Sequence, residues 1–193
     1  MVHRACILCV ARLVYKYECV QRLALGAAAT VLAETVIIPE DKYMDLAILE
    51  ALKAKSEGDY AVGAVVIKDD RVLGAASNRS RRDNSPTAHA ELLAIQQAAR
   101  NTGSRHLLDA DIYTTHEPCP MCAGAIVWGK MRAVVFGARI SDLKNYGQQN
   151  GNAKFLWRAI DISCHEVISR SCEFVQVVGN FRRADCVDLF HNK

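Results

Sequence analysis

Two short motifs in the sequence carry side chains that could bind a metal ion. The motif PTAHAE contains His89 and Glu91, and the motif THEPCPMC contains Cys119 and Cys122. One imidazole and two thiolates form a borderline-soft ligand set that suits zinc. Each motif comes directly before an apolar segment with helical periodicity, so both belong at the start of a helix. The sequence therefore predicts a Zn²⁺ site formed by two helix starts.

The spacing of the two cysteines fits this site. Cys119 and Cys122 stand three residues apart, and residues at i and i+3 share one face of a helix. Pro120 suits the first helical position, because its missing N–H costs nothing there. The positive end of the helix lowers the pKa of a nearby thiol and favours the thiolate that zinc needs. We therefore expect both sulfurs to reach one metal ion, together with His89 from the first turn of its own helix.

Glu91 points to catalysis rather than to a structural role for the metal. Residues at i and i+2 do not share a helix face, so His89 and Glu91 can converge only near the open N-terminal end of their helix. A site with three protein ligands leaves a fourth position for water, which is typical of catalytic zinc. Zinc lowers the pKa of a bound water towards ~7, and a nearby carboxylate can take and return its protons. This predicts attack of zinc-bound hydroxide on an amino-bearing carbon and loss of ammonia, with Glu91 as the proton shuttle.

Two alternatives remain open from the residues alone. One is a closed structural zinc site with a fourth ligand from the remaining candidates, which are His106, His116, His165, Cys164 and Cys172. His116 is the nearest of these in sequence, but a residue three positions before Cys119 at a strand end should point elsewhere. The other alternative is a non-catalytic, zinc-bearing interaction module.

The first half of the chain contains the elements that must position these residues. Residues 41–58 predict a helix with an apolar stripe of Met44, Ala47, Ile48, Ala51 and Leu52. Two strands, 60–68 and 71–78, flank Asp69–Asp70 as a hairpin, and a polar loop follows. A helix is expected over 87–103, with Thr87 as its N-cap and Gly103 just past its end.

The second half continues this alternation. We expect a strand over 111–117, a helix over 119–130 and a strand over 133–139. Residues 140–152 are rich in Asn, Gln and Gly and are expected to form a polar loop. A helix around 154–160, a strand near 165–169 or 173–178, and a closing helix over 184–192 complete the chain. Alternating strands and helices predict an α/β fold with helices on both faces of one sheet, which the early hairpin makes mixed.

Composition limits the kind of protein. With 193 residues, 51% of them hydrophobic and 23% charged, the chain suits one domain, residues 40–193, with an N-terminal extension over residues 1–39. The basic extension could target an organelle, but we expect a cytoplasmic protein. No apolar stretch approaches the ~20 residues that span a bilayer, so no membrane partner is expected. The formal charge of +3 does not by itself indicate nucleic acid. The eight cysteines lack the dense spacing of a disulfide scaffold, so most should be small buried hydrophobes.

The motifs His89-Ala90-Glu91 and Pro118-Cys119-Pro120-Met121-Cys122 resemble the H-x-E…P-C-x-x-C signature of the cytidine-deaminase-like superfamily. PTAHAE, EPCPMCAGAI and VVFGAR are similar to the branch with tRNA adenosine deaminases and guanine or cytosine base deaminases. This resemblance covers about residues 41–190. It implies a three-layer α/β/α fold around a mixed sheet of about five strands.

The resemblance also implies roles for individual residues. It makes His89, Cys119 and Cys122 the zinc ligands and Glu91 the proton shuttle. Asn78 matches an asparagine that holds the substrate, and the backbone N–H groups of Ala90 and Cys119 would contact the base and the attacking oxygen. Members of this family are usually dimers or larger assemblies, so we expect a homodimer.

The substrate is less well determined than the reaction. Trp128 resembles the free-base deaminases, where a tryptophan could stack on a flat base, although the segment NYGQQN lacks the acidic run of the guanine enzymes. Arg79, Arg81 and Arg82 provide cations for tRNA, but an Arg-rich C-terminal tail is missing. We therefore expect a free nucleobase or nucleoside resembling guanine, isocytosine or cytosine. The alternative is adenosine in tRNA, converted to inosine.

Overall fold

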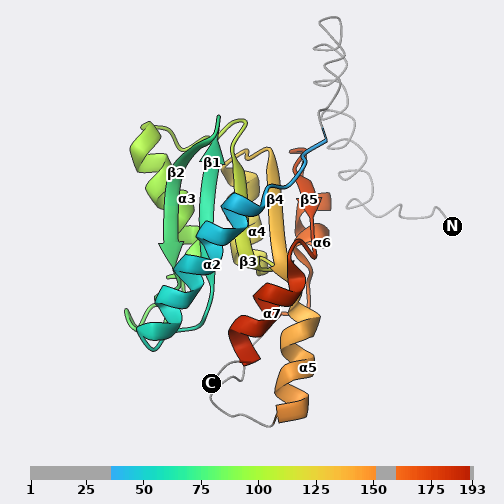
Figure 1. Ribbon diagram of the computed structural model, residues 1–193. Coiled ribbons are helices and arrows are strands. Elements are labelled where there is room, and N and C mark those ends of the chain that lie inside the picture. Colours follow the sequence, from blue (N-terminus) through green and yellow to red (C-terminus); the bar gives the residue numbers. More distant parts are fainter. Residues whose placement is uncertain (1–35, 151–159, 192–193) are drawn as a thin grey trace, which may run out of the picture. The chain divides into compact units, whose positions relative to one another are not determined.

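The computed structural model describes residues 36–150 and 160–191, which contain a mixed sheet of five strands (Figure 1). The strand order is β2-β1-β3-β4-β5, and β1 pairs antiparallel with both β2 and β3. The β3–β4 and β4–β5 pairs are parallel. The strands are β1 (Gly63–Lys68), β2 (Arg71–Ser77), β3 (Asp111–His116), β4 (Ala133–Ala138) and β5 (Gln176–Val178). The mixed α/β sheet expected from the sequence is confirmed.

Helices cover both faces of this sheet. The described helices are α2 (Asp41–Ser56), α3 (Ala90–Thr102), α4 (Pro120–Trp128), α5 (Ile140–Asn150), α6 (Cys164–Ser169) and α7 (Arg183–His191). Successive strand residues point to opposite faces, so each strand supplies two cores. Val66 of β1 joins a cluster with residues of α3 and α4, while its neighbour Val65 joins a cluster with residues of α2 and α7. Figure 1 shows α2 and α7 in front of the sheet, so the fold has three layers.

The elements before α4 follow the sequence closely. Both turn residues of the hairpin, Asp69 and Asp70, have positive φ (48° and 58°), as a two-residue type I′ turn requires. Gly103 ends α3 with a left-handed φ of 65°. The expected N-cap of α3 at Thr87 is wrong. The Thr87 hydroxyl lies 3.3 Å from that of Ser85, and the helix begins two residues later, with His89 as its N-cap.

A close approach of two backbones places α3 on the sheet. A Cβ at Gly74 of β2 would lie 2.3 Å from the carbonyl oxygen of Ala94 in α3, which is far inside van der Waals contact. The α3 residues on this side, Ala90, Ala94 and Ala98, are small and fully buried. Strand β2 and helix α3 can therefore touch through their backbones. This contact fixes where the start of α3 lies relative to the sheet.

The second half contains one clear correction. Residues 140–150 form the helix α5 rather than a loop, because Leu143 and Tyr146 lie one turn apart and are both buried. The many polar residues of this segment cover its outer face and conceal this short apolar stripe. Of the two candidate segments for the last strand, 173–178 contains β5, whereas 165–169 lies in α6. The closing helix is confirmed as α7, and the helix expected around 154–160 falls almost entirely outside the described residues.

The N-terminal extension stays a prediction, since residues 1–35 lie outside the described residues. Within the described segments, no helix is both long enough and apolar enough to cross a membrane.

Two of the remaining cysteines, Cys164 and Cys186, are fully buried free thiols, as expected for small core residues.

Candidate metal centre

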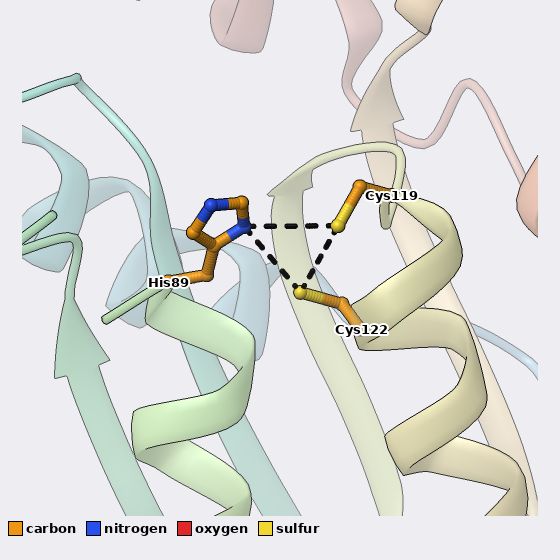
Figure 2. Close-up of side chains that lie close together, drawn as sticks. All are labelled: His89, Cys119 and Cys122. Atoms are coloured by element: carbon orange, nitrogen blue, oxygen red, sulfur yellow. Dashed lines mark hydrogen bonds between the residues drawn. The ribbon is translucent and has the colours of Figure 1, made fainter. Parts of the chain in front are cut away.

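The starts of α3 and α4 bring the three predicted metal ligands together. Figure 2 shows the His89 ring facing the sulfurs of Cys119 and Cys122, with the histidine at the start of one helix and the cysteines at the start of the other. His89 and Cys119 are the N-cap residues, and both have extended backbone conformations with ψ of 146° and 166°. Pro120 occupies the first helical position, as predicted. Residues from two separate motifs therefore converge because each motif ends an extended segment and begins a helix.

The spacing of the ligand atoms fits a tetrahedral zinc ion. His89 Nδ1 lies 3.7 Å from Cys119 Sγ and 3.6 Å from Cys122 Sγ, and the two sulfurs are 3.6 Å apart. With Zn–S bonds of about 2.3 Å and Zn–N bonds of about 2.1 Å, tetrahedral angles place two sulfurs about 3.8 Å apart and a sulfur and a nitrogen about 3.6 Å apart. The three atoms therefore already have the separations that a zinc ion needs.

The group contains three ligands and not four. Within residues 36–150 and 160–191, no further His, Cys, Asp or Glu atom lies within 4.8 Å of all three ligand atoms. The candidates for a closed site thus do not join it. His116, for example, is buried, and its Nδ1 lies 3.3 Å from the carbonyl oxygen of Glu117. A set of three protein ligands is the arrangement of catalytic zinc sites.

The hydrogen bond between the two cysteines favours the thiolate of Cys119, while the same bond and burial raise the pKa of Cys122. The pKa of the Cys119 thiol is lowered from 9.0 to about 4, chiefly by its hydrogen bond with Cys122, and His89 lowers it further. A thiolate is the form that coordinates zinc. Cys119 is therefore ready to bind a cation at neutral pH.

Glu91 lies in the first turn of α3 and is almost completely buried, with 3% of its surface exposed. Burial removes the solvent that would stabilise its charge and raises its pKa from 4.5 to about 7. The His89 ring, two residues away, acts in the opposite direction by favouring the carboxylate. A carboxyl group that titrates near neutral pH beside the metal ligands is suited to take up and release protons.

Asn78 is buried at the end of β2 and is held by two hydrogen bonds from its side-chain amide. Asn78 Nδ2 donates to Asp59 Oδ1 at 2.7 Å and to Ser80 Oγ at 2.8 Å. Only 4% of the Asn78 surface is exposed. The residue is therefore a fixed polar group and not a mobile surface side chain.

A backbone hydrogen bond links the segment that follows Asn78 to the segment that precedes His89. The next residue, Arg79, donates its N–H to the carbonyl oxygen of Ala88 at 2.9 Å, and Ala88 directly precedes His89. Asp59, which holds the Asn78 amide, was missed by the sequence reasoning. Its signal was weak, since it is a single acidic residue in the turn between a helix and a buried strand.

The remaining predicted site residues differ in their positions. Ala90 is fully buried at the first helical position, where a backbone N–H has no partner within its own helix. Trp128 is 83% exposed at the opposite end of α4, about 9 Å along the helix axis from Cys122. The structure of the single chain does not bring Trp128 to the metal ligands. Its role in substrate binding stays a prediction.

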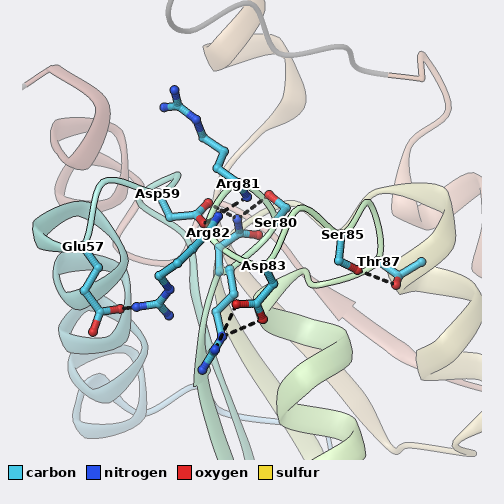
Figure 3. Close-up of polar contacts among 10 residues, drawn as sticks. Glu57, Asp59, Ser80, Arg81, Arg82, Asp83, Ser85 and Thr87 are labelled. Atoms are coloured by element: carbon cyan, nitrogen blue, oxygen red, sulfur yellow. Dashed lines mark hydrogen bonds and ion pairs between the residues drawn. The ribbon is translucent and has the colours of Figure 1, made fainter.

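The basic loop near the site is tied to neighbouring carboxylates. Arg79 forms an ion pair with Asp83, and Arg82 pairs with Glu57 (Figure 3). The Arg81 guanidinium lies over the ring of Tyr60, 5.6 Å from its centroid. Figure 3 shows the Arg81 side chain extending away from the hydrogen-bonded cluster at its base.

The fold and the three-ligand site together define an α/β domain with a candidate zinc centre between two helix starts. The chain belongs to the family described as the cytidine and deoxycytidylate deaminase zinc-binding region, whose model matches residues 38–138. The matched segment contains His89, Glu91, Cys119 and Cys122.

Relatives of two kinds share this domain. The chain is 41% identical to a tRNA-specific adenosine deaminase of Bacillus subtilis over 51% of its length and 62% of the relative's. It is 31% identical to that of Streptococcus pyogenes serotype M18 over 76% of its length and 84% of the relative's. It is also 38% identical to a guanine deaminase of B. subtilis over 60% and 70% of the two chains. The chain spans less than two thirds of some of these relatives, 64% for the tRNA-specific adenosine deaminase of Agrobacterium fabrum.

The solved structures that resemble this chain also include both a tRNA adenosine deaminase and a guanine deaminase. A structure from studies of A-to-I editing by tRNA:A34 deaminases has a TM-score of 0.65 and 28% identity, covering 78% of this chain and 99% of its own. The structure of guanine deaminase from B. subtilis has a TM-score of 0.54 and 35% identity, covering 57% and 71%. The cytidine-deaminase-like fold is therefore confirmed.

Proposed function

We propose that the protein is a zinc-dependent aminohydrolase that removes an exocyclic amino group from a free nucleobase or nucleoside. One observation carries this proposal: three ligand atoms with tetrahedral zinc spacing lie at the helix start that also carries Glu91, a carboxyl group with only 3% of its surface exposed. Neither a closed structural zinc site nor a simple interaction module needs such a residue.

The protein side chains divide the work of the reaction. When bound, zinc supplies a Lewis acid that makes water a nucleophile at neutral pH. His89, Cys119 and Cys122 hold the ion. Glu91 accepts a proton from the attacking water and returns it to the departing amino group. Asn78 binds the ring of the base and fixes its orientation.

Adenosine in tRNA is the second candidate substrate. The tRNA-specific adenosine deaminases are the more numerous relatives, and one is similar over 76% of the chain. Arg81 extends from the loop beside the site and could contact a phosphate (Figure 3). The free base is supported by the guanine deaminase relative. It is also supported by Asn78, whose Nδ2 donates to Asp59 and Ser80 and so leaves the amide oxygen to accept a hydrogen bond from a ring N–H.

A substrate panel tests the proposal. Ammonia release should be measured with guanine, isocytosine, cytosine, adenine and their nucleosides, and inosine formation with tRNA. We expect turnover of at least one free base or nucleoside by the wild-type protein and none by Glu91→Gln with its zinc retained. Inosine formation in tRNA without turnover of any small molecule would select the second candidate.

The homodimer implied by the resemblance stays a prediction. Met121 and Trp128 give α4 an exposed apolar surface, with 37% and 83% of these residues exposed. Light scattering on the full chain measures the assembly directly, and a monomer at micromolar concentration would contradict the expectation.

A further inference from the structure

A buried cluster around Asp59 lies beside the metal centre and is not explained by zinc binding. Asp59 Oδ1 accepts hydrogen bonds from the Tyr60 N–H at 2.8 Å and from Asn78 Nδ2 at 2.7 Å. Asp59 Oδ2 accepts from the N–H groups of Arg81 and Arg82, at 3.0 Å and 2.9 Å. Figure 3 shows the bonds that reach Asp59 from the loop that carries Ser80, Arg81 and Arg82.

The chemistry of this cluster fixes which end of the Asn78 amide faces Asp59. An ionised carboxylate only accepts hydrogen bonds, whereas the two ends of an asparagine amide differ, since the nitrogen donates and the oxygen accepts. Both acceptors next to Asn78, the Asp59 carboxylate and the Ser80 hydroxyl, receive bonds from Nδ2. The NH₂ group has two hydrogens, so both are used.

The amide oxygen of Asn78 is left for another partner. Within the described segments, Asn78 makes its side-chain hydrogen bonds through Nδ2 alone. The oxygen makes no hydrogen bond with Asp59 or Ser80, since both of these contact the nitrogen. The Arg79–Ala88 backbone bond joins the residue after Asn78 to the residue before His89.

We propose that Asp59 is a positioning residue that determines substrate choice, because it holds Asn78 so that only a hydrogen-bond acceptor faces the substrate pocket. The matching substrate must then present a ring N–H to Asn78 Oδ1. Guanine, isocytosine and cytosine each carry a ring N–H as free bases. Adenosine within RNA carries none, since its ring nitrogens only accept. This inference rests on the proposed function and narrows its substrate class.

The experiment compares guanine with 1-methyl-, 7-methyl- and 9-methylguanine on the zinc-loaded full chain. A methyl group at the position facing Asn78 removes the N–H and leaves the buried oxygen without a partner, so we expect KM to rise about tenfold or more for one derivative. In Asp59→Asn the Asn78 amide can rotate and present either end. The ratio of KM for that methyl derivative to KM for guanine should then fall below about threefold. The main reason is that KM for guanine rises, while kcat changes less.

Two further variants separate positioning from folding. Asp83→Asn changes a carboxylate of the same loop that pairs with Arg79 and does not touch Asn78, so the KM ratio should stay at its wild-type value. Ser80→Ala removes the second acceptor of Asn78 Nδ2 and should lower the ratio by a smaller amount, which tests the idea even if Asp59→Asn folds poorly.

The outcomes are distinct. An equal loss of kcat for all bases with an unchanged KM ratio would show that Asp59 only stabilises the loop, and would overturn the inference alone. Asn78-dependent deamination of adenosine in tRNA would overturn the requirement for a ring N–H. If no base in the panel is deaminated, the proposed free-base activity fails and the inference fails with it.

Discussion

Two buried carboxyl groups near the metal centre meet opposite surroundings. Asp59, in the turn between α2 and β1, accepts four hydrogen bonds from N–H donors. Glu91, in the first turn of α3, is dominated by loss of solvent, which raises its pKa to about 7. A carboxylate surrounded by hydrogen-bond donors holds its neighbours in place. A desolvated carboxyl group has a raised pKa and can therefore take up and release a proton near neutral pH. The same chemical group therefore serves orientation in one region and proton transfer in the other.

Removal of the metal is expected to have the largest effect and to act on the Glu91 side of this comparison. Thorough chelation should abolish ammonia release, and added Zn²⁺ should restore it, because Glu91 needs a metal-activated water as its partner. The far-UV circular dichroism spectrum should change little, since the two apolar cores lie on the sheet faces. Turnover that survives complete metal removal would contradict the zinc mechanism.

Isosteric changes at the two carboxyl groups should then separate their roles. Glu91→Gln should lower kcat by at least about 100-fold with zinc content unchanged, because an amide cannot transfer the proton. Asp59→Asn should act mainly on KM, as argued above. Steady-state kinetics and metal analysis of both proteins provide the test. Equal effects on kcat at the two positions would remove the distinction between them.

The pH dependence of stability offers a third test, on zinc-free protein. The folded-state pKa of Glu91 is raised from 4.5 to about 7, so the folded state binds the extra proton and loses stability as pH rises through this window. Above pH 7 the ionised, buried carboxylate costs about 3 kcal/mol. Glu91→Gln should therefore gain up to about this amount over wild type at pH 8 and show no gain near pH 4. Denaturant unfolding at both pH values measures the difference.

The buried His116 also makes stability depend on pH, so the stability of wild type must be compared with that of Glu91→Gln. Burial lowers its pKa from 6.5 to about 4, so its contribution to stability is present above pH 6.5 and is lost as pH falls towards 4. This opposes the effect of Glu91 in the wild-type curve. The difference between wild type and Glu91→Gln cancels the His116 contribution. An equal gain at both pH values would show that Glu91 does not titrate in this range.

Trp128 should give the smallest effect of the series. If substrate choice depends on Asp59 and Asn78, Trp128→Ser should change the KM ratio of guanine to its methyl derivatives by less than about twofold. Because the side chain is 83% exposed, the free energy of unfolding should change by about 0.5 kcal/mol or less. A tenfold rise in KM for all bases would instead support the stacking role expected from the sequence.

Much of the fold followed from local patterns. The hairpin at Asp69–Asp70, the end of α3 at Gly103 and the proline at the start of α4 each depend on backbone preferences of a few residues. The error at α5 has the opposite origin. Its apolar stripe is short and its composition polar, so only the contacts of Leu143 and Tyr146 with the rest of the chain show that the segment is a helix.

The sequence by itself determined the three ligand types, their positions near two helix starts and the presence of Glu91 two residues after His89, because motif spacing and the approximate start of a helix are local properties. That His89 rather than Thr87 is the N-cap was shown only by the structure. Only the tertiary structure decided how the two motifs meet, with ligand atoms 3.6–3.7 Å apart. It also decided that Asp59 holds Asn78, a contact between residues 19 positions apart that depends on the pairing of β1 with β2. Such contacts carry no local pattern, since the path of the chain and not the spacing of residues brings the side chains together.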